Sequence, residues 1–262
     1  MFDYAAPREF KATTKKLGVG QHPHRGFETV TIAFQGEVEH GDSLGNRGTI
    51  GTGDVQWMTA SKGIVHEEFH SRKFAAAGGT FEMVQLWVNL PAAKKMIPPA
   101  YQEITTAMIP KEKLSSESCA ADGSEVTEAD GYVRIISGIY NGVKGAATTH
   151  SPVNLWDVLL SRTDRAYDLN IEAGHTTLIF VRRGSVDILG QELKLADVAI
   201  MSLDGTKVTL QAKTADTQIL VLSGEPLNEP IAARGPFVMN TQKELQEAMQ
   251  DYQYGRNGFT HF

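Results

Sequence analysis

The stretch QHPHRGFETVTIAFQGE, residues 21–37, decides the fold of this 262-residue chain. Its second half, TVTIAF over 29–34, is rich in β-branched residues and predicts a strand that ends at Gly36. Its first half carries His22-Pro23-His24, and a period of two places both imidazoles on one face of an extended strand. The stretch therefore predicts a β-protein with two histidines aimed at one point.

A second pair of candidate ligands lies further along the chain, in His66-Glu67-Glu68. The same spacing puts His66 and Glu68 on one face and turns Glu67 the other way. Two such strands side by side would bring three imidazoles and one carboxylate together. That set suits a divalent transition metal such as iron, and it leaves coordination positions open for water, oxygen or a substrate. We therefore predict a metal site made of His22, His24, His66 and Glu68.

Glu28 is a competing carboxylate, because it shares the strand face of the two histidines before it. Four residues of extended strand separate Glu28 from His24, or roughly 13 Å. Glu28 reaches the metal only if the strand bulges, and Gly26 is a place for a bulge. Glu68 is the favoured fourth ligand and Glu28 is the alternative. Either carboxylate is a candidate to accept a proton from a substrate.

Several other histidines have no second histidine two positions away. We expect surface positions for four of them: His40, His70, His150 and His261. Asp54 is better explained by the turn at Gly53-Asp54 than by acid–base chemistry.

Composition and charge narrow the class of function. The chain is 41% hydrophobic, with a net charge of −6 and a pI near 5.8, which argues against a nucleic-acid surface. Its single cysteine, Cys119, fits a reducing compartment, so we expect a cytoplasmic location. The N-terminal MFDYAAPREF lacks the features of a secretory signal, and no apolar run has the length of a membrane span.

Two β-rich halves flank a segment of different amino-acid composition. Residues 1–110 predict the first domain, 111–130 a partly irregular connector with several polar residues, and 131–262 the second domain. A capping box over 241–244, followed by an apolar stripe, predicts a helix over 241–254. We assign this helix to the second domain.

The two halves show a faint internal repeat. Residues 36–38 match 184–186 at an offset of 148, and 54–55 match 197–198 at an offset of 143. A duplicated unit with a hairpin five residues shorter in the second copy explains both offsets. Under this alignment four residues without imidazoles lie opposite the candidate ligands: Asn170, Glu172, Thr209 and Gln211. We therefore predict one metal, in the first half only.

Motifs over nearly the whole chain resemble the pirins, a family of bicupins. They are residues 21–37, GDVQWMTASKGIVHEEF (53–69), LWVNLP (86–91), SGEPLNEP (223–230), GPFVMNT (235–241) and GRNGF (255–259). The resemblance implies two jelly-roll (cupin) β-barrels packed face to face, with one metal, usually iron, in the N-terminal barrel. The family's ligands fall on His22, His24, His66 and Glu68, in agreement with the spacing argument.

For bacterial members, the resemblance implies a metal-dependent dioxygenase of the quercetin 2,3-dioxygenase type. The expected partners are Fe(II), or another divalent transition metal, with O₂ and a flavonol or related aromatic substrate. Four apolar residues are candidates for the pocket wall, although each also suits a plain core position: Phe27, Phe34, Trp57 and Met58. The alternative function is that of a metal-dependent regulatory protein, which binds a transcription factor or a metabolic enzyme.

One feature departs from the family pattern. Pirins usually carry a further strand segment before the position of Phe2-Asp3, where this sequence begins. Either the start is wrongly assigned, or the sequence is trimmed, or the first barrel has incomplete pairing at one edge. An unpaired edge would lower stability and favour aggregation or dimerisation.

Overall fold

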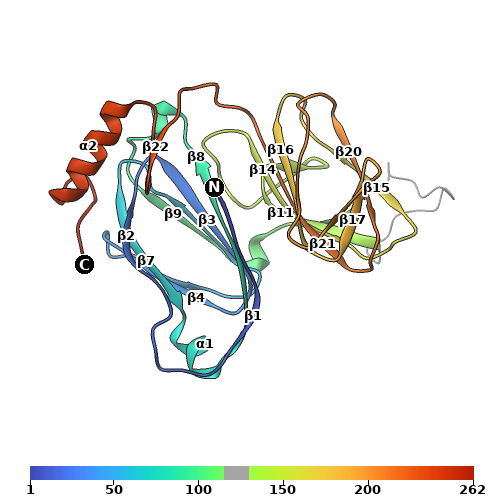
Figure 1. Cartoon of the computed structure of the whole chain (residues 1–262), viewed down its shortest axis with the longest axis horizontal. Helices are drawn as coiled ribbons and strands as arrows, with labels where there is room; N and C mark the ends of the chain where they lie inside the picture. Colours follow the sequence, from blue (N-terminus) through green and yellow to red (C-terminus); the bar gives the residue numbers. More distant parts are fainter. Residues whose placement is uncertain (115–129) are drawn as a thin grey trace. The chain divides into compact units, whose positions relative to one another are not determined.

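The computed structural model describes residues 1–114 and 130–262 (Figure 1). The backbone divides into two compact units, of which the first joins Met1–Thr106 to Asn228–Phe262 and the second is Ala107–Leu227. Strands dominate both units, and the α-helices of the described residues are α1 (Arg72–Ala77) and α2 (Gln242–Gln253). Neither of these helices has the length and apolar character needed to cross a membrane.

The first unit is built from two antiparallel sheets (Figure 1). One has the order β1-β8-β3-β6-β9, formed by Phe2–Phe10, Gly79–Asn89, Phe27–Gln35, Val55–Thr59 and Ala100–Ile104. The other has the order β2-β7-β4-β5, formed by Gly18–His24, Ile64–His70, Val38–Asp42 and Arg47–Ile50. A hydrogen bond from Thr31 of β3 to Glu68 of β7 shows that the inner faces of the sheets meet, as in a jelly roll.

The second unit has the same design. Its larger sheet has the order β10-β11-β14-β21-β16-β19, formed by Lys111–Lys113, Gly131–Ser137, Val153–Leu160, Thr217–Gly224, Thr176–Arg183 and Val198–Ile200. Its smaller sheet has the order β15-β20-β17-β18, formed by Ala166–Asn170, Lys207–Ala212, Ser185–Ile188 and Gln191–Lys194. A small hairpin adds β12 (Ile139–Tyr140) and β13 (Val143–Lys144). Two β-barrels with a C-terminal helix confirm the predicted fold class.

The predicted internal repeat is visible at matching turns. Gly36 and Gly184 each join a strand of the larger sheet of their unit to a strand of the smaller sheet. Both have a positive φ, of 84° and 74°. Asp54 and Asp197 each accept a hydrogen bond from a backbone N–H three residues earlier, at 2.9 and 2.8 Å. Asp54 is therefore a turn residue, as expected. The matching turns also show that the two units repeat one arrangement of strands.

The strand pairing corrects the predicted alignment by one residue. Val38 of β4 lies opposite His70 of β7, and its counterpart Val186 of β17 lies opposite Ala212 of β20. The two candidate ligand positions on β7 therefore correspond to Val208 and Leu210, and not to Thr209 and Gln211. Counted from the matching aspartates, Asp54 and Asp197, the segment that leads into the β20 pairing is one residue shorter than the segment that leads into the β7 pairing. The short motifs used for the alignment do not cover this segment.

The same shift applies to the other ligand strand. His22 pairs with His66, as Leu169 pairs with Val208. Leu169 and Ile171 therefore replace the predicted equivalents Asn170 and Glu172. A one-residue slip moves a side chain to the opposite sheet face, and the corrected equivalents are aliphatic residues in the core of the second unit. Their side chains have no atom that binds a metal.

The C-terminal segment corrects the predicted domain division. It contains β22 (Ala232–Arg234), β23 (Phe237–Met239) and α2, and it belongs to the first unit. The helix begins at Gln242, directly after the Thr241 N-cap of the predicted capping box, but its buried Leu245 and Ala248 pack in one cluster with Val65 of β7. An apolar stripe predicts that one face of the helix is buried, but it does not indicate against which barrel that face packs. Within the predicted connector, 111–113 form β10, and Cys119 and the rest of 115–129 lie outside the described residues.

Lys95 ties three segments of the first unit together. Its ammonium donates to the carbonyl of Gly26 at 2.6 Å, to Asn89 Oδ1 at 2.6 Å and to the carbonyl of Val238 at 2.9 Å. The side chain is 1% exposed, and burial lowers its pKa to about 8. The turn before β3, the end of β8 and the C-terminal segment thus depend on one buried cation.

We expect Lys95→Met to lower the free energy of unfolding by about 2–4 kcal/mol, because it leaves buried carbonyl oxygens without a donor. A lowered pKa in the folded state means that the unfolded chain binds the proton more tightly. Stability should therefore rise with pH between about 8 and 10.5 through this group, and the rise should be missing from the variant. Urea unfolding of both proteins at several pH values measures the difference, and equal pH slopes would contradict the assignment.

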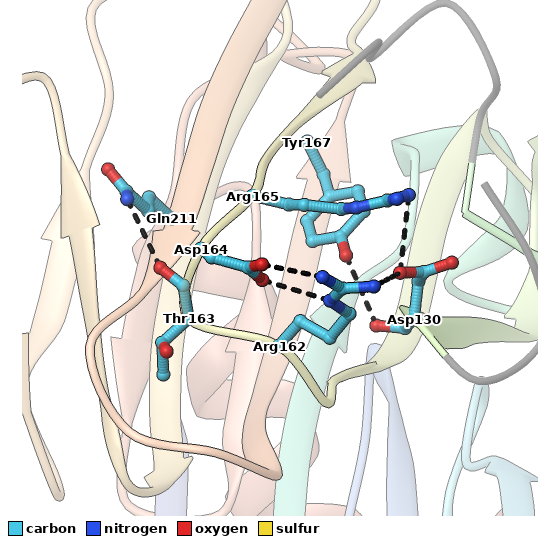
Figure 2. A network of polar contacts seen from close by, with 7 residues as sticks. All are labelled: Asp130, Arg162, Thr163, Asp164, Arg165, Tyr167 and Gln211. Atoms are coloured by element: carbon cyan, nitrogen blue, oxygen red, sulfur yellow. Dashed lines mark hydrogen bonds and ion pairs between the residues drawn. The ribbon is translucent and has the colours of Figure 1, made fainter. Parts of the chain in front are cut away.

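A polar network fixes the start of the first long strand of the second unit (Figure 2). The Asp130 carboxylate is buried and lies 3.5 Å from a guanidinium nitrogen of Arg162 and 3.3 Å from one of Arg165. Arg162 also binds Asp164, and the Tyr167 hydroxyl donates to the Asp130 carbonyl at 3.4 Å. The loop between β14 and β15 is thereby held against the residue that precedes β11.

Candidate metal centre

Three of the predicted ligands come together inside the first unit. β2 and β7 are antiparallel neighbours, and His22 lies directly opposite His66. His24 follows at the predicted spacing, and one ring nitrogen from each of the three histidines lies within 4.8 Å of the others. The ring centroids are 4.3–4.9 Å apart. The spacing of the two sequence motifs therefore produces the cluster that it predicts.

Glu68 shares the inner face of β7 with His66, but its carboxylate is not part of this tight cluster. It reaches toward the facing sheet, where Gln85 Nε2 donates to both of its oxygens at 3.1 and 2.9 Å. Thr31 Oγ1 donates to Oε1 at 3.2 Å, and Gln85 also donates to Thr31 at 3.1 Å. The carboxylate is thus anchored beside the histidines rather than among them.

Glu28 is not brought to the histidines. It pairs with Thr59 across the β3–β6 ladder and accepts a 2.6 Å hydrogen bond from its hydroxyl. The β3 register is regular from Phe27 to Ala33, so Glu28 and Thr31 point to opposite faces. Because Thr31 faces Glu68 and the barrel interior, Glu28 lies on the other side of the sheet. The bulge at Gly26 that would redirect it is not present in this ladder.

Burial sets the electrostatics of the cluster. The pKa values of His24 and His66 lie well below 6.5, chiefly because burial disfavours the charged ring and secondarily because neighbouring histidines repel it. Neutral imidazoles, the form that binds metals, therefore prevail near neutral pH. The Pro236 carbonyl opposes the shift of His24 slightly, although it makes no hydrogen bond of normal geometry.

The ring nitrogens of the two buried histidines need partners. Neither nitrogen of His24 or of His66 has a hydrogen bond within the described residues, and such groups are costly when they stay unpaired. His22 differs, because its Nδ1 lies 2.8 Å from the carbonyl of Gly20. That bond places the ring proton on Nδ1 and leaves Nε2 free as a ligand atom. The donor set thus fits a divalent transition metal.

Residues around the cluster include several that the sequence motifs did not reveal. Trp87 and Phe27 stack at 4.2 Å, and both contact the ring of His24, at 5.4 and 5.1 Å. Phe27 was among the predicted wall residues, whereas Trp87 was not. Period-two spacing along β8 from Gln85 is the signal that would have found Trp87.

His40 corrects the prediction that it is a surface residue. It is 7% exposed, lies opposite Glu68 in the β4–β7 ladder and stacks on Tyr101 at 5.6 Å. His70 is wrongly predicted as well, because its ring packs against Phe10 and Phe81 at 4.7 and 4.4 Å. The sequence around a lone histidine on a strand does not indicate whether its face of the strand is buried. That depends on the neighbouring strands, which the sequence alone does not identify.

The other predicted wall residues divide between the two faces of the larger sheet. Met58 lies opposite Thr29 on the inner face, where Tyr101 donates a hydrogen bond to its sulfur. Trp57 alternates with Met58 and is fully buried on the other face, as a core residue. Phe34 is 7% exposed at the end of β3.

Comparison with known proteins identifies the family. The pirin family model matches residues 1–88, and the model of the pirin C-terminal cupin domain matches residues 155–258. A Pseudomonas aeruginosa protein named "Putative quercetin 2,3-dioxygenase" is 48% identical over 98% of this chain and 85% of its own length. A pirin-like protein of Solanum lycopersicum is 37% identical over 95% of this chain and 79% of its own length.

Solved structures agree with this relationship. The crystal structure of quercetin 2,3-dioxygenase from Acinetobacter baumannii has a TM-score of 0.90 and 50% identity, over 99% of this chain and 86% of that chain. The Escherichia coli bacterial pirin in complex with nickel(II) shares the fold, with a TM-score of 0.59 and 24% identity over 84% of this chain and 80% of that chain. The chain belongs to the pirin family.

Proposed function

We propose that this protein is a metal-dependent oxygenase of the quercetin 2,3-dioxygenase type, acting on a flavonol or a related aromatic with O₂. The observation that carries the proposal is the buried histidine cluster with a carboxylate anchored beside it. The Acinetobacter baumannii quercetin 2,3-dioxygenase supports it through 50% identity over 99% of this chain.

The metal proposed is Fe(II), held by His22, His24 and His66, with Glu68 as the fourth ligand. Imidazole nitrogen suits iron, nickel, copper and zinc alike, so the donor set itself accepts several divalent ions. When bound, the metal would supply Lewis-acid catalysis and lower the pKa of a coordinated substrate hydroxyl.

The protein's own groups divide the remaining work. Glu68 is proposed to accept the proton of the substrate hydroxyl, since it is the one carboxylate of the predicted set that faces the cluster. Phe27 and Trp87 offer an apolar wall next to His24 for an aromatic ring. His22 is half-buried whereas His24 and His66 are buried, so substrate and oxygen are proposed to approach from the His22 side.

The test is anaerobic reconstitution with Fe(II), followed by quercetin turnover measured through absorbance and O₂ uptake. We expect turnover by the reconstituted wild type and none by the metal-free protein or by His66→Ala. Flavones, which lack the 3-hydroxyl group of the flavonols, should not react, because they have no proton at the position from which Glu68 is proposed to accept one. Stoichiometric Fe(II) binding without turnover would contradict the oxygenase proposal.

A second candidate is a metal-dependent regulatory protein that binds a protein partner. Several relatives carry family names without an activity, such as Pirin-1 of Arabidopsis thaliana, 34% identical over 92% of this chain. The net charge of −6 suits protein contacts better than nucleic acid. This candidate function predicts that Fe(II) changes the affinity of the protein for its partner. Stoichiometric Fe(II) binding without quercetin turnover would favour this second candidate.

A further inference from the structure

A cavity of the first unit lies outside the cluster of His22, His24 and His66. It has a volume of about 400 Å³ and is bordered by the segment before β2, by helix α1 and by strands of the four-stranded sheet. Glu67 and Phe69 of β7 point to this side, because they alternate with the inward-facing His66 and Glu68. The cavity therefore borders the outer face of the sheet whose inner face carries the candidate metal centre, and at the end of β7 it also reaches His70.

Cationic side chains dominate its border. Lys15, Lys16, Arg47 and Arg72 all line it, against a single lining carboxylate, Glu39. On a chain with a net charge of −6, such a group concentrates positive potential at one place. The cavity therefore favours a ligand of negative charge.

The existing ion pairs do not neutralise this group. Lys16 and Arg47 share one carboxylate, that of Glu67, at 3.2 and 3.6 Å. The side chains of Lys15 and Arg72 make no ion pair or side-chain hydrogen bond among the described residues. Two cations thus remain available for a ligand.

The other lining groups are apolar or hydrogen-bond donors. The ring of Phe69 lies 3.7 Å from the Lys16 ammonium, and Ala75 and Ala76 of the α1 region add an apolar surface. His70 lines the same cavity, and its buried Nδ1 has no partner within the described residues.

We propose that this cavity binds a small organic anion, with a phosphate or carboxylate group held by Lys15 and Arg72 and an apolar body against Phe69 and Ala75. Arginine forms paired hydrogen bonds with either anionic group, and lysine adds a point charge. The volume of about 400 Å³ falls in the range of small-molecule sites. The proposal is independent of the metal and of the oxygenase activity.

Phenyl phosphate and benzoate are the probes, and benzyl alcohol is the neutral control, each titrated into the full chain and followed by NMR. The His66→Ala background removes binding of the anions to the metal centre. We expect saturable binding of the anions, weakened by salt, and no binding of the alcohol. Arg72→Gln and Lys15→Gln should each weaken binding by about fivefold, as expected for one exposed charge contact.

Lys73→Gln is the matched control. Lys73 adjoins Arg72 and carries the same charge, but it binds Glu37 at 2.9 Å and does not line the cavity. Its replacement should leave the affinity within about twofold of the parent. The proposal is overturned if neither anion saturates at concentrations up to about 20 mM, a range that covers weak millimolar binding, or if Lys73→Gln weakens binding as much as Arg72→Gln does.

Discussion

Replacing His66 by alanine is expected to abolish stoichiometric metal binding, from about one equivalent per chain to less than about a tenth, because one of the three histidine ligands is lost from a buried site. His66 is fully buried and lies directly opposite His22, and it supplies one of the three clustered ring nitrogens. Metal analysis after reconstitution with Fe(II), and again with Ni(II), measures the change.

Thermal unfolding gives an independent measure of the same loss. A ligand present at a hundred times its dissociation constant stabilises the folded state by about 2.7 kcal/mol, so the wild type should unfold at a higher temperature when metal is added. His66→Ala should show no such rise. Its metal-free stability should change only modestly, because removal of two unpaired ring nitrogens offsets part of the cost of the cavity.

His261→Ala is the control for this experiment. His261 is an exposed histidine that contacts Tyr252 and is not one of the clustered residues. It should bind metal and respond to it as the wild type does. Full metal content in His66→Ala would show that the ligand assignment is wrong, whatever its effect on turnover.

The histidine cluster was predictable from the sequence because it depends on local rules. His22 and His24 are two residues apart on one strand, and a strand alternates its faces whatever surrounds it. The pairing of β2 with β7 then needed only two strands of matching pattern. The helix α2 was predictable for the same reason, since its capping box and apolar stripe lie within a few residues.

Features that depend on distant strands were not predictable. The spacing along the strand favours Glu68 over Glu28 but leaves Glu28 as an alternative, and the pairing of β3 with β6 and β8 is what shows that Glu28 faces away. The repeat alignment failed for a related reason. A one-residue deletion in a turn leaves every motif recognisable, yet it exchanges the buried face for the exposed one, as at Leu169 and Val208.

The second prediction concerns Gln85, which the sequence did not single out. We expect Gln85→Leu to lower kcat/KM for quercetin by about 10–100-fold, the usual effect of removing a group that orients a metal-site residue. Gln85 donates to both oxygens of Glu68, so the variant leaves a buried carboxylate with Thr31 as its remaining side-chain donor in the described part of the chain. Steady-state kinetics of the Fe(II)-loaded protein measures the loss.

Gln56→Leu is the matched control, because Gln56 and Gln85 flank Thr31 on opposite sides in the same sheet. Gln56 is buried whereas Gln85 is half-buried, and the Gln56 amide nitrogen makes no hydrogen bond within the described residues. Its replacement removes a similar side chain without disturbing Glu68. Equal losses of turnover in the two variants would mean that barrel packing, and not the orientation of Glu68, accounts for the effect.

Metal content of Gln85→Leu then separates two roles for Glu68. If Glu68 is a ligand, its loosened carboxylate should weaken metal binding in parallel with turnover. If Glu68 only accepts the substrate proton, the three histidines should retain the metal while turnover falls. The carboxylate lies outside the tight histidine cluster and is anchored at 2.9–3.2 Å to the opposite sheet. This geometry fits a proton acceptor directly, whereas a ligand role requires the carboxylate to move closer to the three histidines.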